Sequence, residues 1–258
     1  MVGAAGTGAG PGRRRRPLIG VLGGLGPAAT VDFYAKVVAA TAAASDQEHV
    51  RLMIDADPTV PDRSASVAGT GESSAPALIE KARRLAAAGA DMLTMPCNSA
   101  HAYETAIRQA VDLPFVSIIE ETVRAAMRHM VDVDQRHSAV GVLATSATLA
   151  TGLYAKAFAA HGVAVVQPDK EGETTFMALL ARIKGGEQRH PDVSDSMASL
   201  ASELVRRGAF VIIGGCTEVP LVLDQEKLSA ALAAADLPGA VFIDSTAALA
   251  AAIVELGS

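Results

Sequence analysis

Two halves of the chain repeat three segments in the same order, and this repetition constrains the fold more than any other feature. The paired segments are separated by 119 to 124 residues, and one pair aligns both cysteines of the chain without a gap. Matches in order at a nearly constant spacing predict an internal duplication. The three pairs are 19–30 with 140–151, 89–98 with 208–217, and 112–122 with 236–246.

Apolar strands alternate with helical patterns along both halves, and this alternation predicts the fold class. We expect an α/β protein with two pseudo-symmetric three-layer lobes, each a parallel sheet covered by helices on both faces. Predicted strands are 18–22, 50–55, 91–95, 115–119, 139–143, 163–166, 209–213 and 240–243. Predicted helices are 32–44, 75–88, 174–184 and 194–207.

Composition narrows the class of protein and of partner. The chain has 258 residues with a net charge of −6, so we expect neither nucleic acid nor a membrane as a partner. Its apolar runs are shorter than the roughly 18 to 20 residues that span a bilayer. Residues 1–16 combine a Gly/Ala-rich stretch with four arginines, which predicts a flexible N-terminal tail without the order of a signal peptide. We expect a cytoplasmic protein.

The two cysteines lie at equivalent places in the two halves. Cys97 follows the predicted strand 91–95, and Cys216 follows the predicted strand 209–213. Ligands of parallel α/β folds bind beyond the carboxyl ends of the strands. We therefore expect the active site in the cleft between the lobes, with one cysteine on each side of it. A small buried hydrophobe is the alternative role of each cysteine.

Two thiols on opposite sides of a carbon are the apparatus that inversion of that carbon requires. One thiolate removes a proton from one face, and one thiol returns a proton to the other face. A cysteine at the start of a helix lies in a positive field, which lowers its pKa, and we expect this of both thiols. The duplication therefore predicts a racemase that uses Cys97 and Cys216 as acid and base.

Polar groups close to the cysteines are candidates for binding the substrate. The loops around Gly24 and Thr145 offer backbone N–H groups to a carboxylate. A tight turn between strand and helix is the alternative explanation of the glycines in the first loop. Asn98, Ser99 and Thr217 offer hydrogen bonds at the level of the cysteines.

The motifs of this chain resemble the aspartate/glutamate racemase family, and most of all its aspartate racemase branch. The resemblance begins at Pro17 and covers nearly all of the remaining chain. Its opening motif is 19–30, its cysteine motifs are 95–101 and 214–221, and Ser99 stands where threonine is commoner. The resemblance implies an amino-acid racemase that needs no cofactor, neither pyridoxal phosphate nor a metal, and that commonly forms a homodimer.

The resemblance also implies further residues and the division into lobes. Arg63 matches an arginine that binds the distal carboxylate of a small dicarboxylic amino acid, and Lys184 matches a lysine of the second half more loosely. Glu218 is carried over as a further substrate-binding residue. In this family the terminal segment of the chain returns to the other lobe. We therefore expect a first lobe of residues 17–115 with 225–258 and a second lobe of residues 116–224.

Other functions stay open at this point. A hydantoin racemase or a maleate isomerase has the same superfamily features, and a two-lobed small-molecule binding protein has the same cleft without reactive thiols. A Cys–His hydrolase or amidotransferase would use Cys97 and His101 but would leave Cys216 without a role. A zinc site at the same pair lacks the third protein ligand that catalytic zinc needs.

Overall fold

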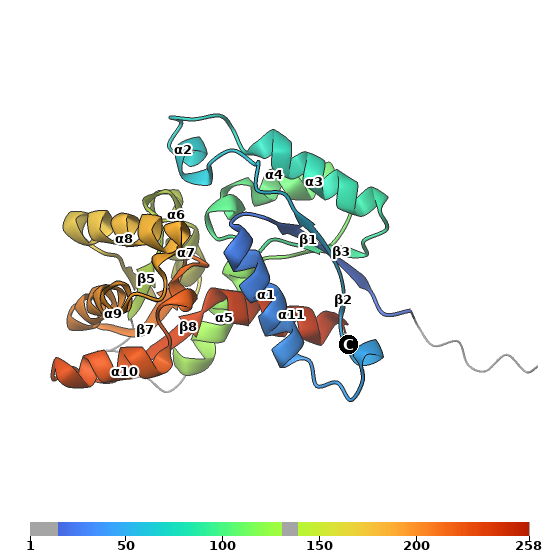
Figure 1. The fold of residues 1–258 in the computed structure, drawn as a ribbon. Coiled ribbons are helices and arrows are strands. Elements are labelled where there is room, and N and C mark those ends of the chain that lie inside the picture. The colour runs from blue at the N-terminus through green and yellow to red at the C-terminus, as the bar shows by residue number, and fades with distance from the viewer. Residues whose placement is uncertain (1–14, 131–138, 258) are drawn as a thin grey trace, which may run out of the picture.

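The computed structural model describes residues 15–130 and 139–257 and contains two four-stranded parallel sheets (Figure 1). The first sheet has the order β2-β1-β3-β4, and the second has the order β6-β5-β7-β8. Equivalent strands therefore occupy equivalent positions, which confirms the predicted α/β fold with two similar parallel sheets. The strands are β1 (Leu18–Gly23), β2 (Arg51–Ala56), β3 (Met92–Thr94), β4 (Phe115–Val116), β5 (Ala139–Leu143), β6 (Ala164–Val166), β7 (Ala209–Gly214) and β8 (Val241–Asp244).

Helices cover both faces of each sheet. Alternate residues of β7 belong to different hydrophobic clusters: Val211 and Ile213 face one cluster and Ile212 faces the other. In β1, Ile19 and Leu22 likewise belong to different clusters. The helices that supply these clusters are α1 (Pro27–Ala40), α3 (Ala75–Ala87), α4 (Glu104–Ala110), α5 (Ile118–Met130), α7 (Leu153–Ala159), α8 (Lys170–Arg182), α9 (Pro191–Arg206), α10 (Gln225–Ala234) and α11 (Ser245–Gly257).

Short helical segments lie in the connections between these strands and helices. They are the 3-10 turns η1 (Asp46–Glu48), η2 (Ser99–Tyr103) and η5 (Val219–Leu221), the helices α2 (Arg63–Val67) and α6 (Ser146–Thr151), and the π-helical segment η4 (Ile183–Glu187).

The last helix of each half packs against the other half. Helix α5 follows β4 of the first sheet but packs against α7, β7 and β8 of the second. Helix α11 follows β8 of the second sheet but packs against α1 and β1 of the first, as Figure 1 shows. One hydrophobic cluster therefore contains side chains from both sheets, such as Ile19 and Val140, together with Ile253 of α11.

The predicted return of residues 225–258 to the first lobe is wrong for its first part. Strand β8 hydrogen-bonds to β7, and α10 packs against α9, so residues 225–244 belong with the second sheet. The chain returns only at Ser245, where α11 begins. We therefore propose a first lobe of residues 17–116 with 245–257.

The predicted strand 115–119 is shorter in the structure. Strand β4 ends at Val116, and the backbone N–H of Glu121 already donates to the Ser117 carbonyl in the first turn of α5. Glu120 and Glu121 favour a helix here because acidic side chains in the first turn interact well with the helix dipole.

The predicted flexible tail of residues 1–16 lies outside the described residues as far as residue 14. Its last two residues contact the rest of the chain. The Arg15 guanidinium donates to the Asp91 carboxylate at 2.9 Å, and Arg16 donates to the backbone carbonyls of Gln47 and Glu48. The flexibility of the tail stays a prediction.

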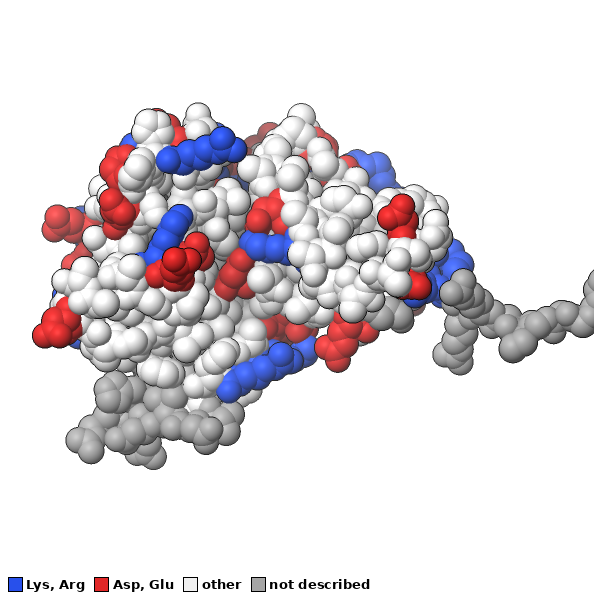
Figure 2. All heavy atoms as spheres, turned by 60° about the horizontal axis from the view of Figure 1, so that its bottom comes forward, with Lys and Arg blue, Asp and Glu red and all other residues white. Residues whose placement is uncertain are grey.

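Surface charge is mixed on the face in Figure 2, where acidic and basic side chains alternate between broad uncharged areas. Within the described ranges, no helix combines the length and the apolar character that a membrane crossing demands.

Candidate active site

Both cysteines line one small cavity at the carboxyl ends of the strands. Cys97 comes from the loop after β3 and Cys216 from the loop after β7, and the two residues are 5% and 8% exposed. The structure thus brings together the predicted site residues of both halves, with the exception of Gly24. The lining is Leu25, Asp62, Arg63, Ser64, Cys97, Asn98, Ser99, Thr145, Thr148, Lys184, Gly215, Cys216, Thr217 and Glu218.

The Cys216 thiol points at a carboxylate. Its Sγ lies 2.9 Å from Glu218 Oε2, so the S–H donates to that oxygen. Burial raises the pKa of Cys216 well above its usual value, and the negative charge of Glu218 raises it further. The expectation that a helix start lowers this pKa is wrong, because only the short 3-10 turn η5 follows and burial has the larger effect.

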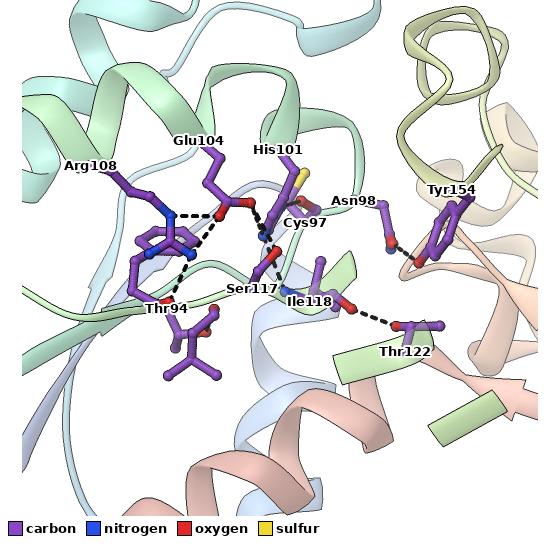
Figure 3. A network of polar contacts seen from close by, with 12 residues as sticks. Thr94, Cys97, Asn98, His101, Glu104, Arg108, Ser117, Ile118, Thr122 and Tyr154 are labelled. Atoms are coloured by element: carbon purple, nitrogen blue, oxygen red, sulfur yellow. Dashed lines mark hydrogen bonds and ion pairs between the residues drawn. The ribbon is translucent and has the colours of Figure 1, made fainter. Parts of the chain in front are cut away.

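The backbone of Cys97 is fixed by a buried histidine (Figure 3). The N–H of Ile118 donates to His101 Nε2 at 3.2 Å, so the proton of the neutral ring is on Nδ1. That Nδ1–H donates to the Cys97 carbonyl at 2.7 Å. Both ring nitrogens are therefore bonded to backbone atoms, and His101 does not serve the Cys97 thiol as a base. The sequence analysis considered this residue only as a hydrolase base or a zinc ligand.

The buried ring of His101 makes stability depend on pH. Burial lowers the pKa of His101, because protonation would charge a desolvated ring and remove the acceptor for Ile118. The unfolded chain then binds the extra proton more readily than the folded chain. Stability is therefore retained above about pH 6.5, the unperturbed pKa of histidine, and lost as the pH falls below it.

We expect His101→Asn to flatten this pH dependence between pH 7.5 and 5, as measured by urea unfolding. The asparagine amide donates to the Cys97 carbonyl but does not titrate. His161→Asn is the matched control, since His161 is exposed, and it should keep the dependence of the unsubstituted chain. An unchanged slope in His101→Asn would contradict the prediction.

Asn98 links the two halves beside Cys97. The hydroxyl of Tyr154 in α7 donates to Asn98 Oδ1 at 2.6 Å, as drawn in Figure 3. Asn98 Nδ2 donates to Ser245 Oγ at 3.1 Å, and that hydroxyl donates to the Gly214 carbonyl at 2.7 Å. The amide therefore fixes the cysteine loop against the second sheet, and its role is more structural than we expected.

Tyr154 and Ser245 were missed as site-forming residues by sequence reasoning. Ser245 lies within the third repeated segment, 236–246, and that repetition is a signal that could have found it. Tyr154 lies inside a helix with no motif around it, so the sequence holds no comparable signal.

Two cations border the cavity without a carboxylate partner in the part of the chain that the structure describes. Arg63 opens α2 of the first half, and its Nη1 donates to the carbonyls of Val60 and Pro61, while its buried Nε has no hydrogen-bond partner among the described residues. Lys184 comes from η4 of the second half. Cations without a carboxylate partner among the described residues suit an anionic ligand that binds between the two halves.

Gly24 does not offer its N–H to a ligand. The N–H donates to Thr30 Oγ1 at 2.8 Å, and a Cβ at Gly24 would approach the Asp57 backbone to 2.5 Å. With a φ of +81°, this glycine makes the tight turn between β1 and α1. The expected carboxylate contact at Gly24 is therefore wrong, and the alternative explanation, a turn, holds.

Thr145 lines the cavity but also caps a helix. Its Oγ1 accepts the N–H of Thr148 at 3.2 Å at the start of α6.

Lys81 is a buried cation that supports the loop after β1. Its Nζ donates to the Gly23 carbonyl at 2.9 Å. Among residues 15–130 and 139–257, no three His, Cys, Asp or Glu side chains gather as metal ligands would.

A protein-family comparison matches almost the whole chain. The family model described as "Asp/Glu/Hydantoin racemase" covers residues 22–253. A broad-specificity amino-acid racemase, RacX of Bacillus subtilis (strain 168), is 28% identical over 92% of this chain and 97% of its own length. A glutamate racemase of Roseiflexus sp. (strain RS-1) is 32% identical over 55% of this chain and 49% of its own length.

Solved structures share the fold. The aspartate racemase of Picrophilus torridus superposes with a TM-score of 0.77 at 26% identity, over 93% of each chain. An aspartate racemase homologue from Pyrococcus horikoshii OT3 gives a TM-score of 0.70 at 22% identity, over 93% of this chain and 99% of the other. The latter likeness concerns the fold alone.

Proposed function

The chain belongs to the Asp/Glu/hydantoin racemase family. We propose that it racemises a small dicarboxylic amino acid without a cofactor, and that it prefers aspartate to glutamate. The observation that carries this proposal is the single cavity lined by Cys97 and Cys216 from equivalent loops of the two halves. One thiol of each half lies beside the bound substrate, as an inversion at one carbon requires.

The proposed chemistry is a transfer of two protons. A thiolate removes the α-proton, and the electron pair of the C–H bond passes into the adjacent carboxylate. The thiol of the other half then gives its proton to the opposite face. Return of the first proton to its original face regenerates the substrate, so inversion needs both sulfur atoms.

The choice of substrate rests on Arg63 and Lys184. Both border the cavity, one from each half, and a dicarboxylate has one carboxylate for each cation. Hydroxyl groups of Ser99, Thr145 and Thr217 offer the remaining hydrogen bonds. Aspartate and glutamate differ by one methylene, which gives only modest discrimination, and the RacX relative is itself named as broad in specificity.

The other candidates differ in how they fit the site. Hydantoin racemase or maleate isomerase activity is the nearest alternative, because it uses the same fold and a cysteine. The Cys–His hydrolase is disfavoured because both nitrogens of His101 are bonded to backbone atoms. A two-lobed binding protein would not require a thiol beside a carboxylate, as Cys216 is here.

Chiral chromatography of reaction products tests the proposal. The purified chain is incubated with L-aspartate, L-glutamate, L-alanine, maleate and an L-5-substituted hydantoin. We expect D-aspartate to form fastest. Turnover of maleate or the hydantoin without racemisation of aspartate would favour the alternative, and no turnover of any of them would favour the binding protein.

We further propose that the enzyme works as a homodimer in the cytoplasm. A subunit contact at α1 is supported by the exposed apolar side chains of Val31, Tyr34 and Val38 on that helix. Two free cysteines are compatible with a reducing compartment.

A further inference from the structure

The two halves differ in the residue that contacts the thiol. Two positions after Cys97 is Ser99, and two positions after Cys216 is Glu218, so these residues are equivalent in the repeat. Cys97 Sγ lies 3.6 Å from Ser99 Oγ, a neutral hydroxyl. Cys216 Sγ lies 2.9 Å from a carboxylate oxygen. The duplication has therefore given the two thiols unequal surroundings.

Glu218 is the charged group that bonds directly to Cys216. It is 6% exposed, so water screens its charge poorly. A carboxylate accepts a hydrogen bond from S–H but repels a thiolate at the same place. Burial raises the pKa of the Tyr154 hydroxyl, and Cys216 raises it further, so this tyrosine adds no charge beside Cys216.

Other charges near Cys216 come from the elements packed around the cavity. Lys184 of η4 favours the thiolate, but its effect on Cys216 is smaller than that of Glu218. Asp62 and Arg63, at the start of α2, border the same cavity with opposite charges. Among the charged groups around Cys216, Glu218 therefore has the largest effect, and it acts in the same direction as burial.

We propose that Glu218 is a positioning residue that keeps Cys216 protonated in the free enzyme, so that Cys97 is the thiol that ionises first and serves as the base. This inference rests on the proposed function for its catalytic meaning. Glu218 accordingly acts through Cys216 in addition to any contact with substrate.

One consequence concerns how the enzyme resets. After one turnover Cys97 holds the α-proton, and Cys216, which has given up its own, is a thiolate beside Glu218. Repulsion by the carboxylate favours transfer of the proton from Cys97 to Cys216, through water, before the next turnover. Because enantiomers have equal free energy, kcat/KM is the same in both directions, so rates with the two enantiomers do not reveal the resting state.

The test observes each sulfur separately. Cys97 and Cys216 are the only cysteines of the sequence, so protein labelled with [3-¹³C]cysteine gives two signals, assigned with Cys97→Ser and Cys216→Ser. The ¹³Cβ shift is followed from pH 5 to 11 in the full chain without substrate. We expect the Cys97 signal to titrate at lower pH than the Cys216 signal. The reverse order overturns the proposal.

Glu218→Gln removes the charge and keeps the shape. We expect it to lower the titration midpoint of Cys216 by about one pH unit or more, and to leave that of Cys97 in place. Ser99→Ala is the matched change at the equivalent position and should not move the Cys216 midpoint. An unmoved Cys216 midpoint in Glu218→Gln, in a variant whose other spectrum is native, contradicts the proposal.

A pH profile of kcat/KM gives a second measure. Activity requires one thiolate and one thiol, so the alkaline limb of the bell reports loss of the Cys216 proton. Glu218→Gln should move that limb to lower pH. The NMR titration needs no activity, so a protein that fails to racemise amino acids can still pass it, and the two proposals fail separately.

Discussion

Replacing either Cys97 or Cys216 by serine is expected to lower the racemisation of aspartate by about a thousandfold. A serine hydroxyl is far too weak an acid to be an anion near neutral pH, so the variant lacks one of its two proton carriers. Both cysteines line the same cavity, one from each half. Loss of either one should therefore remove inversion in both directions, as measured by chiral chromatography.

The single variants also contain their own folding control. Each keeps one thiol, and this thiol can still exchange the α-proton of one enantiomer with solvent. We expect exchange without inversion in at least one variant, which demonstrates a folded site. Inversion at the original rate in both variants would contradict the two-thiol mechanism.

Replacing Arg63 by alanine is expected to lower kcat/KM for aspartate by about a hundredfold or more. The change leaves the distal carboxylate of the substrate without its cation in a largely enclosed cavity. We expect the loss in KM more than in kcat, because the distal carboxylate does not change charge during the reaction. Steady-state kinetics with aspartate and alanine measure the effect.

The comparison between substrates separates binding from misfolding. Arg63→Ala should reduce the preference for aspartate over alanine, whereas general damage lowers both activities alike. Arg63→Lys should recover part of the activity, since lysine keeps the charge but not the forked geometry. Arg83→Ala, an exposed arginine of α3 in the same half, should change neither. An unchanged preference in Arg63→Ala would exclude the assigned role.

The repeat and the strands could be predicted because they are local patterns. Strand 139–143 agrees with β5 residue for residue, and helix 75–88 agrees with α3 to within one residue at its end. Pairing the cysteine segments across the repeat was enough to place both thiols at one cavity. Two sheets with the same strand order follow from the same repetition.

The point at which the chain returns to the first half was harder to predict, because it depends on long-range packing of α11 against α1. The repeat makes its neighbour β8 the equivalent of β4 and so places it beside β7, but the division implied by the resemblance moved residues 225–258 as one piece. The sequence also does not show which backbone N–H groups are free to bind a ligand. Gly24 was expected to bind a carboxylate, but its N–H is taken by Thr30, six residues further along.

The protonation of the thiols illustrates a similar limit. A cysteine before a helix predicts a lowered pKa, but the structure reverses this for Cys216 because burial and Glu218 act in the same direction. Glu218 was named from a resemblance as a substrate ligand, and only the distance to Sγ reveals its contact with the thiol.

Deuterium labelling by the unsubstituted enzyme tests the two-thiol account most directly. L-aspartate is converted in deuterium oxide, and both enantiomers are analysed by mass spectrometry at low conversion. Because the thiol that protonates the opposite face has equilibrated with solvent, the account predicts D-aspartate that carries α-deuterium and remaining L-aspartate that is nearly free of it. Equal deuterium in both enantiomers at early times would mean that one base serves both faces, and would contradict the account.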